Sequence, residues 1–313
     1  MEYLILIAGF LVLAVSGNYL IEGSVSLARH LKISTLVVGV VVVSFGTSAP
    51  ELIVSLQAAL NGHPDIAIGN VIGSNISNIA LVLGITALLL PIPVKSNSIK
   101  IDWPVMMLSS ILLYVFILNY IIERWEGAIL ITSIIVFIYW SIRSSRKKTE
   151  NNNSIDKPKH KLYLAIIFII VSCVGLVFGA KLFVNSSIEI ARNFDISERV
   201  ISVTLVAFGT SVPELVASIV AVFKKQMDIS IGNIIGSNIF NVLAIIGITS
   251  IVTPISNIDK GIVNFDIFWM LGISALLFLF IIPLKGGILN RWKGLLLLIS
   301  YAVYIFLLFY LRK

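Results

Sequence analysis

The stretch FGTSAPEL, residues 45–52, occurs a second time as FGTSVPEL, residues 208–215. The same shift of 163 positions aligns IGNVIGSNISN (68–78) with IGNIIGSNIFN (231–241) without a gap, and 32 of the 65 positions from 28 to 92 match. Similar composition alone does not put glycine, asparagine, serine, proline and glutamate in one register. The chain is therefore predicted to consist of two related halves.

The segments around both motifs are strongly apolar. The 313 residues are 58% hydrophobic and 12% charged, with a mean hydropathy of +1.02, which lies outside the range of ordinary soluble domains. Apolar runs of roughly 20 residues, the length that crosses a bilayer core as a helix, recur along the chain. We predict an all-α membrane protein with ten transmembrane helices, at residues 2–24, 33–60, 65–91, 103–121, 126–142, 162–188, 197–223, 228–253, 262–283 and 291–311.

An odd number of spans in each half determines how the halves are related. With five spans each, the second half enters the membrane from the opposite side, so the repeats are inverted, a recurrent design of secondary transporters. The predicted organisation is a five-helix repeat at 1–142, a polar linker at 143–161 and a second five-helix repeat at 162–313. The linker composition favours a solvated, mobile loop.

The net charge of +7 follows this topology. Loops after the odd-numbered spans hold sixteen lysines and arginines, and the loops and terminus on the other side hold six. By the positive-inside rule, the 143–161 loop is cytoplasmic and both termini lie outside the cell. Because topology accounts for the charge, no nucleic-acid partner is expected, and no obligatory protein partner is evident.

Each motif carries a carboxylate near the centre of a predicted span, Glu51 in the first half and Glu214 in the second. A charged group at that depth costs about 3 kcal/mol, so it normally faces a cavity or a partner. The alternative is a neutral carboxyl group hydrogen-bonded to the backbone. Pro50 and Pro213 cannot donate a backbone hydrogen bond and are expected to open the helix, which frees carbonyl oxygens.

Further polar side chains recur at helical spacing around the glutamates and in the following spans. The purely structural alternative is that such hydroxyl groups only hydrogen-bond to the preceding helical turn. However, matching rows of polar side chains in the two repeats, here called stripes, favour a shared site. The stripes comprise Ser44, Thr47, Ser48, Glu51 and Ser55; Thr204, Ser211, Glu214 and Ser218; Asn70, Ser74 and Asn78; and Asn233, Ser237 and Asn241.

All of these potential ligands are oxygen atoms. Neither motif contains cysteine or histidine, so softer transition metals are disfavoured and hard cations such as Ca²⁺ and Na⁺ fit. Two carboxylates neutralise one Ca²⁺ or two Na⁺. A channel with the same oxygen atoms as its filter is a second hypothesis, and an intramembrane enzyme is disfavoured because the sequence has no catalytic constellation.

The paired GTSxPE and GNxIGSN blocks resemble the two alpha-repeats of the sodium/calcium exchangers, within the cation/calcium exchanger superfamily. The resemblance implies a plasma-membrane antiporter of prokaryotic type that expels Ca²⁺ in exchange for Na⁺, in the lipid bilayer and without a cofactor. It places Ca²⁺ between two glutamates and two threonine carbonyls, with flanking Na⁺ sites at serines and two asparagines completing the centre. The implied residues are Glu51, Glu214, Thr47, Thr210, Ser48, Ser211, Ser74, Ser237, Asn78 and Asn241, with backbone oxygens of Ser44 and Ala207.

The identity of the counter-ion is left open by one position. Some relatives carry an aspartate where this chain has Asn241, and an acid there is associated with potassium use, so potassium cotransport is disfavoured. Proton/calcium exchangers usually carry a different, Asn-Ala-x-Glu motif. Protons are still expected to compete with the cations, because a buried carboxylate favours its neutral form.

Overall fold

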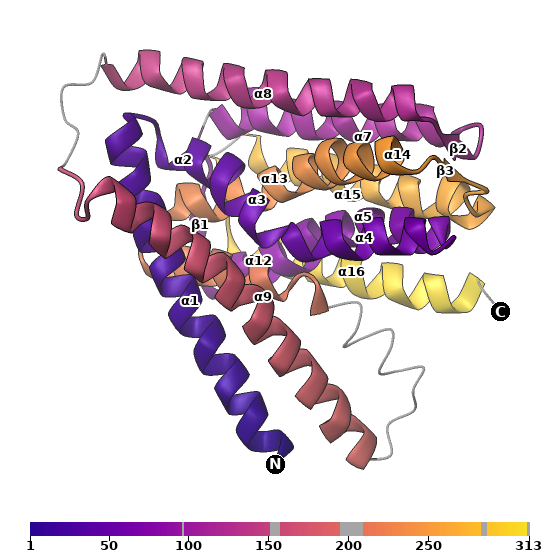
Figure 1. Cartoon of the computed structure of the whole chain (residues 1–313), viewed down its shortest axis with the longest axis horizontal. Helices are drawn as coiled ribbons and strands as arrows, with labels where there is room; N and C mark the ends of the chain where they lie inside the picture. The colour runs from indigo at the N-terminus through magenta and orange to yellow at the C-terminus, as the bar shows by residue number, and fades with distance from the viewer. Residues whose placement is uncertain (96, 151–156, 195–208, 283–286, 312–313) are drawn as a thin grey trace. The chain divides into compact units, whose positions relative to one another are not determined.

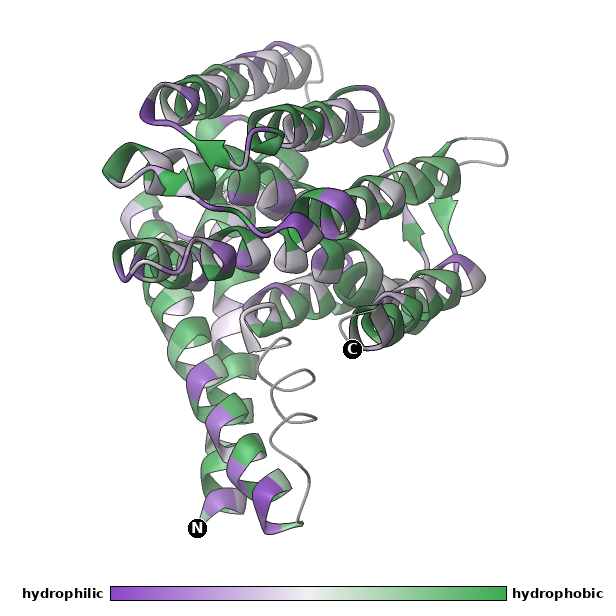
Figure 2. Cartoon of the chain, turned by 90° about the vertical axis from the view of Figure 1, so that its right-hand side faces the viewer, coloured by the Kyte–Doolittle hydropathy of each residue, from purple (hydrophilic) through white to green (hydrophobic). Residues whose placement is uncertain are grey.

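The computed structural model describes residues 1–95, 97–150, 157–194, 209–282 and 287–311, most of them helical (Figure 1). Within these ranges, eight helices are long and apolar enough to cross a membrane, or up to nine if Thr35–Thr47 and Ala49–Leu60 form one broken span. Figure 2 shows that hydrophobic residues dominate the helices. The prediction of a multi-pass helical membrane protein is confirmed. Ten spans and external termini stay predictions, and residues 197–208 of the seventh predicted span lie outside the described residues.

The chain divides into two compact units, each of which is described by itself. The first comprises Met1–Pro50 and Ile142–Asn233, and the second comprises Glu51–Ser141 and Ile234–Lys313. Each unit therefore combines segments from both sequence halves. The division into 1–142, 143–161 and 162–313 stays a prediction about the repeats.

The first unit is built on two long helices, α1 (Glu2–Leu31) and α9 (Leu162–Asn193), which lie side by side (Figure 1). Glycine allows their close approach, since a Cβ atom at Gly9 would lie only 2.8 Å from the Phe183 nitrogen. Buried Leu20 of α1 and Leu176 of α9 share a core with residues of the helix that carries Glu214. The main other described elements of this unit are α2 (Thr35–Val38), the π-helical turn η1 (Gly39–Val43), α3 (Ser44–Thr47), the end of α8 (Arg124–Glu150), α12 (Val212–Phe223) and the first half of α13 (Met227–Phe240).

The described part of the second unit contains helices with internal π-helical turns, further helices and four short strands. Two pairs of antiparallel two-residue strands, β1 with β4 and β2 with β3, each join a strand from one half to a strand from the other. The elements are α4 (Ala49–Leu60), α5 (Pro64–Ser77), η2 (Asn78–Leu83), α6 (Gly84–Leu89), β1 (Ile92–Pro93), η3 (Ser98–Asp102), α7 (Trp103–Ile117), β2 (Ile121–Ile122), most of α8 (Arg124–Glu150), the end of α13, η5 (Asn241–Ile246), α14 (Gly247–Val252), β3 (Ile255–Ser256), η6 (Ile262–Asp266), α15 (Ile267–Ile281), β4 (Ile288–Leu289) and α16 (Arg291–Leu311).

The predicted linker is more ordered at its ends than its composition indicates. Helix α8 continues to Glu150 instead of ending at residue 142. At the other end, Glu22 of α1 accepts hydrogen bonds from Lys159 and His160. The Arg29 guanidinium also donates to the Lys157 carbonyl oxygen at 3.1 Å. The N-terminal end of the 143–161 segment therefore continues helix α8. Its C-terminal end is hydrogen-bonded to α1.

Candidate functional site

The serine that follows the threonine has a non-helical conformation in both motifs. Ser48 has φ −85° and ψ 8°, and Ser211 has φ −86° and ψ 1°, so the two repeats share one non-helical backbone conformation. In the first motif, the segments Thr35–Thr47 and Ala49–Leu60 are bent by 46°. A proline follows each serine by two residues, where its missing N–H group and its ring disfavour a continuous helix. The predicted interruption is confirmed in the first motif, whereas residues 195–208, which lead into the second motif, lie outside the described residues.

A cluster in the first unit joins the two motifs directly. The Ser48 hydroxyl donates a hydrogen bond of 3.1 Å to Glu214 Oε1, so a side chain of the first motif contacts the carboxylate of the second. The Thr47 hydroxyl donates to Asn233 Oδ1 at 3.1 Å. All four side chains are buried, with Glu214 at 0% exposure. Residues 163 or more positions apart in the sequence thus form one polar cluster.

The first asparagine of each GNxIGSN block is hydrogen-bonded to the helix that carries a motif glutamate. In the first unit, Asn233 Nδ2 donates to Ser218 Oγ at 3.1 Å and to the Glu214 carbonyl oxygen at 3.4 Å. In the second unit, Asn70 Nδ2 makes the equivalent contacts, at 2.9 Å to Ser55 Oγ and at 3.3 Å to the Glu51 carbonyl oxygen. Glu51 is also fully buried. The repeat therefore preserves local geometry as well as sequence.

A second polar cluster lies wholly in the second unit, where α5 and α13 pass into the π-helical turns η2 and η5. Asn78 and Asn241 are the first residues of these turns, and both are fully buried. π-Helical turns are rare and are frequent at functional sites. Asn78 Nδ2 donates to Asn238 Oδ1 at 3.2 Å, and Asn241 Nδ2 donates to Asn75 Oδ1 at 3.0 Å.

Eleven of the twelve predicted site residues lie in the described ranges, and Ala207 lies outside them. Thr210 is half-buried and the other ten are buried. The first unit contains Ser44, Thr47, Ser48, Thr210, Ser211 and Glu214, whereas the second contains Glu51, Ser74, Asn78, Ser237 and Asn241.

Ser44 has a more local role than the other hydroxyl residues. Its side chain donates to the Val40 carbonyl oxygen, which is the ordinary helical back-bond. Its carbonyl oxygen accepts from Ser48 N at 2.9 Å and from the Thr47 hydroxyl at 3.3 Å. Because the Ser48 N–H group already donates to this carbonyl oxygen, the oxygen is less available to another partner.

Asn75 and Asn238 contact predicted site residues but were not among the predicted ones. They are off the stripe of Asn70, Ser74 and Asn78, since Asn75 follows Asn70 by five residues. The available signal was their identity in both GSN blocks, at the same shift of 163 positions.

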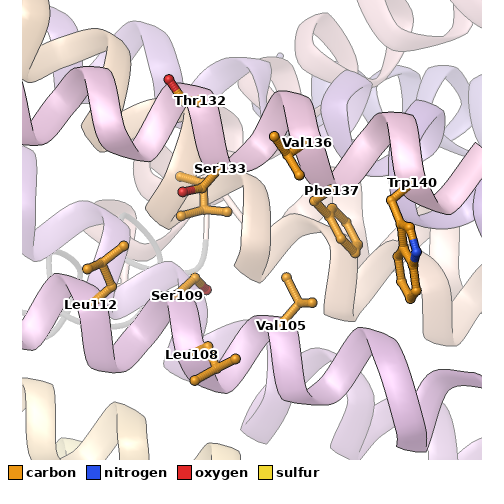
Figure 3. A pocket seen from close by; sticks show the side chains of 10 residues that line it. Val105, Leu108, Ser109, Leu112, Thr132, Ser133, Val136, Phe137 and Trp140 are labelled. Atoms are coloured by element: carbon orange, nitrogen blue, oxygen red, sulfur yellow. The ribbon is translucent and has the colours of Figure 1, made fainter.

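A cavity of about 420 Å³ lies elsewhere in the second unit, between α7 and α8 (Figure 3). Its walls are mainly apolar, and Leu108, Val136 and Trp140 in them are exposed. None of the twelve predicted site residues lines this cavity. Its chemistry suits apolar groups, and the cavity is separate from the predicted site residues.

Charged side chains gather where α1 faces the end of α12. Lys224, directly after α12, donates to the Asn18 carbonyl oxygen at 2.9 Å and lies 3.9 Å from Glu22 Oε2. Burial lowers the pKa of Lys224, and the neighbouring Glu22 partly offsets this effect. The helix that begins with the second motif is thus tied at its far end to α1.

Buried polar groups at helix interruptions in a multi-pass helical protein are typical of secondary transporters. The family model described as sodium/calcium exchanger protein matches residues 1–143 and 164–310, and the chain belongs to this family. The resemblance seen in the motifs is confirmed. The protein is accordingly an exchanger and not an enzyme.

Individual relatives are similar over almost their whole length. CaxA of Alkalimonas amylolytica is 37% identical over 313 residues, covering 97% of each chain. The sodium/calcium exchanger MaX1 of Methanosarcina acetivorans is 31% identical over 349 residues, covering 99% of each. Among solved structures, the sodium-calcium exchanger NCX_Mj superposes with a TM-score of 0.83 at 32% identity, covering 98% of both chains.

Proposed function

We propose that this protein is a secondary-active antiporter that extrudes Ca²⁺ in exchange for Na⁺, with Glu51 and Glu214 as the carboxylates that neutralise the transported cations. The observation that carries the proposal is the hydrogen bond from Ser48 to Glu214. Ser48 belongs to the same motif as Glu51, so the carboxylate of one repeat contacts the motif of the other. The printed names of MaX1 and NCX_Mj as sodium/calcium exchangers support the choice of ions.

Each group in the two clusters has a proposed role in this exchange. The carboxylates of Glu51 and Glu214 and the carbonyl oxygens of Thr47 and Thr210 bind Ca²⁺, for which a flexible shell of six to eight oxygen ligands is typical. The asparagines Asn78 and Asn241 complete the centre. Hydroxyl groups bind the flanking Na⁺ ions, and these belong to Ser48, Ser211, Ser74 and Ser237.

The proposal includes a topology and a motion. We propose ten spans in two inverted five-helix repeats in the plasma membrane, with the 143–161 loop in the cytoplasm and both termini outside. The distribution of basic residues supports this orientation. Access alternates as α1 and α9 slide past the binding clusters. Their glycine contacts, such as Gly9 against Phe183 and Gly175 against Ser16, support close helix packing between them.

The direct test is uptake of radioactive calcium into proteoliposomes loaded with Na⁺. We expect uptake to follow the outward sodium gradient and to be abolished by Glu51→Gln and by Glu214→Gln. Glu189→Gln is the matched control, because Glu189 is exposed and pairs only with Arg192 among the ion pairs described. Uptake that ignores the sodium gradient, or that survives both buried-site substitutions together, would contradict the proposal.

The same vesicles distinguish the related functions. Uptake driven by a pH gradient alone would indicate a proton/calcium exchanger, and a requirement for K⁺ together with Na⁺ would indicate a potassium-dependent one. Single-channel currents at fixed voltage would indicate a channel. Neutral Asn241 supports exchange without K⁺.

A further inference from the structure

Two asparagines of the second unit are interlocked across the repeats. Asn75 Nδ2 donates to the Asn238 carbonyl oxygen, and Asn238 Nδ2 donates to the Asn75 carbonyl oxygen, both at 3.3 Å. The same nitrogens approach methionine sulfur atoms, Asn75 at 3.5 Å from Met270 Sδ and Asn238 at 3.7 Å from Met106 Sδ. Both asparagines are 1% exposed. Among the described residues, each side-chain NH₂ group therefore contacts two acceptors, a carbonyl oxygen and a methionine sulfur.

These two reciprocal hydrogen bonds determine how the side-chain amides of Asn78 and Asn241 are oriented. A carbonyl oxygen can only accept a hydrogen bond, so the NH₂ groups of Asn75 and Asn238 must point to it and their Oδ1 atoms must point away. Those Oδ1 atoms accept from Asn241 Nδ2 at 3.0 Å and from Asn78 Nδ2 at 3.2 Å. The NH₂ groups of Asn78 and Asn241 are thereby engaged.

The opposite ends of these two amides are buried acceptors. Asn78 Oδ1 and Asn241 Oδ1 have no hydrogen-bond partner among the described residues, although both side chains are fully buried. A buried carbonyl oxygen without a donor is costly unless something else, such as a cation, supplies the positive charge. The network thus presents oxygen, and not nitrogen, at two proposed cation ligands.

We propose that Asn75 and Asn238 are positioning residues that hold Asn241 and Asn78, respectively, with their amide oxygens available to the transported cation. The inference rests on the proposed function, in which Asn78 and Asn241 are ligands. An amide needs such orientation because a rotation of its plane would exchange the oxygen for an NH₂ group, which repels a cation. A carboxylate at the same position presents oxygen in either orientation and needs no such partner.

The test uses this difference between amide and carboxylate. Asn75→Leu removes the acceptor for Asn241, and we expect the Ca²⁺ concentration for half-maximal uptake to rise about 10- to 100-fold, the usual effect of losing an outer partner of a metal ligand. In the Asn241→Asp background, the same substitution should have little effect. In the Asn78→Asp background it should keep its full effect, because Asn75 orients only Asn241.

The mirror-image experiment is the matched control. Asn238→Leu should lose its effect in the Asn78→Asp background and keep it in the Asn241→Asp background. Where a leucine variant is unstable, alanine removes the amide without adding volume, and the same pattern is expected. An equal rise in the Ca²⁺ concentration for half-maximal uptake in the wild-type, Asn78→Asp and Asn241→Asp backgrounds would overturn the inference. A merely structural role does not depend on which ligand is a carboxylate.

A second measurement distinguishes failure of the proposed antiport function from failure of the inference about Asn75 and Asn238. Half-saturation can also be measured as stabilisation of the detergent-purified protein by Ca²⁺ against heat, which needs no sodium gradient. If wild-type uptake ignores sodium but Ca²⁺ still stabilises the protein, the antiport proposal fails and the pairing of Asn75 with Asn241 remains testable. If wild-type exchange is normal and the pairing is absent, only the inference fails.

Discussion

Gly232 directly precedes Asn233, which is hydrogen-bonded to the helix that carries Glu214. Gly232 itself packs against backbone atoms of the first unit. A Cβ atom added at Gly232 would lie 2.7 Å from the Leu36 carbonyl oxygen and 3.1 Å from the Val40 nitrogen. Ordinary van der Waals contact begins at 3.4 Å, so Gly232→Ala requires the two segments to separate by about 0.7 Å. Backbone atoms in helices cannot move aside as a flexible side chain can.

The expected change in the free energy of unfolding is the difference between two opposing effects. Overpacking of this kind costs about 1–3 kcal/mol, and the better helix propensity of alanine returns up to about 1 kcal/mol. Since the clash is with backbone, we expect a net destabilisation of about 1–2 kcal/mol. The separation should also weaken the contacts of Asn233 with Thr47 and Ser218, so sodium-driven calcium uptake should slow.

The assays are thermal unfolding of the purified protein in detergent and calcium uptake in proteoliposomes. Gly272→Ala in α15 is the matched control, because a Cβ atom there meets no described atom within 4 Å. The control should be at least as stable as the wild type and transport at its rate. A Gly232→Ala variant as stable and as active as the control would refute the packing argument.

Three other outcomes are expected. Tyr304→Phe should lower thermal stability by about 1–3 kcal/mol, because the buried Tyr304 hydroxyl donates to Asp266 Oδ1 at 3.0 Å, whereas Tyr310→Phe, at an exposed position, should be neutral in the same melting experiment. Acidifying both sides of the membrane should reduce calcium uptake, since protons compete with Ca²⁺ for the proposed carboxylate ligands; uptake that is constant or rises on acidification would contradict this. Asn241→Asp adds a third carboxylate, so proton inhibition in the same titration should begin at a higher pH than in the wild type.

The sequence predicted those features that depend on local pattern and on the repeat. The non-helical conformations of Ser48 and Ser211 follow from proline chemistry, and the burial of Glu51 and Glu214 follows from their depth in apolar spans. The 163-residue register also predicted which residues are equivalent. The matched contacts of Asn70 and Asn233 agree with that equivalence.

Other features depend on contacts that no local pattern specifies. The π-helical turns at Asn78 and Asn241 replace regular α-helix without a proline or glycine at their first residue. The attachment of Lys159 and His160 to Glu22 joins positions more than 130 residues apart. The back-bond of Ser44 depends on a rotamer, which periodicity does not determine. Periodicity identifies the face of a helix, but not the partner that each polar atom selects.

The neutrality of Asn78 and Asn241 sets the charge balance of the proposed exchange. With amides at both equivalent positions, the proposed ligand set contains two carboxylates, Glu51 and Glu214. These neutralise one Ca²⁺ or two Na⁺, so a third bound Na⁺ would leave the loaded protein with a net positive charge. Exchange of three Na⁺ for one Ca²⁺ would also move one charge across the membrane in each cycle, and the rate would then depend on membrane potential. In the proposed site, the orientation of the two amides allows a neutral pair to serve as oxygen ligands for either ion.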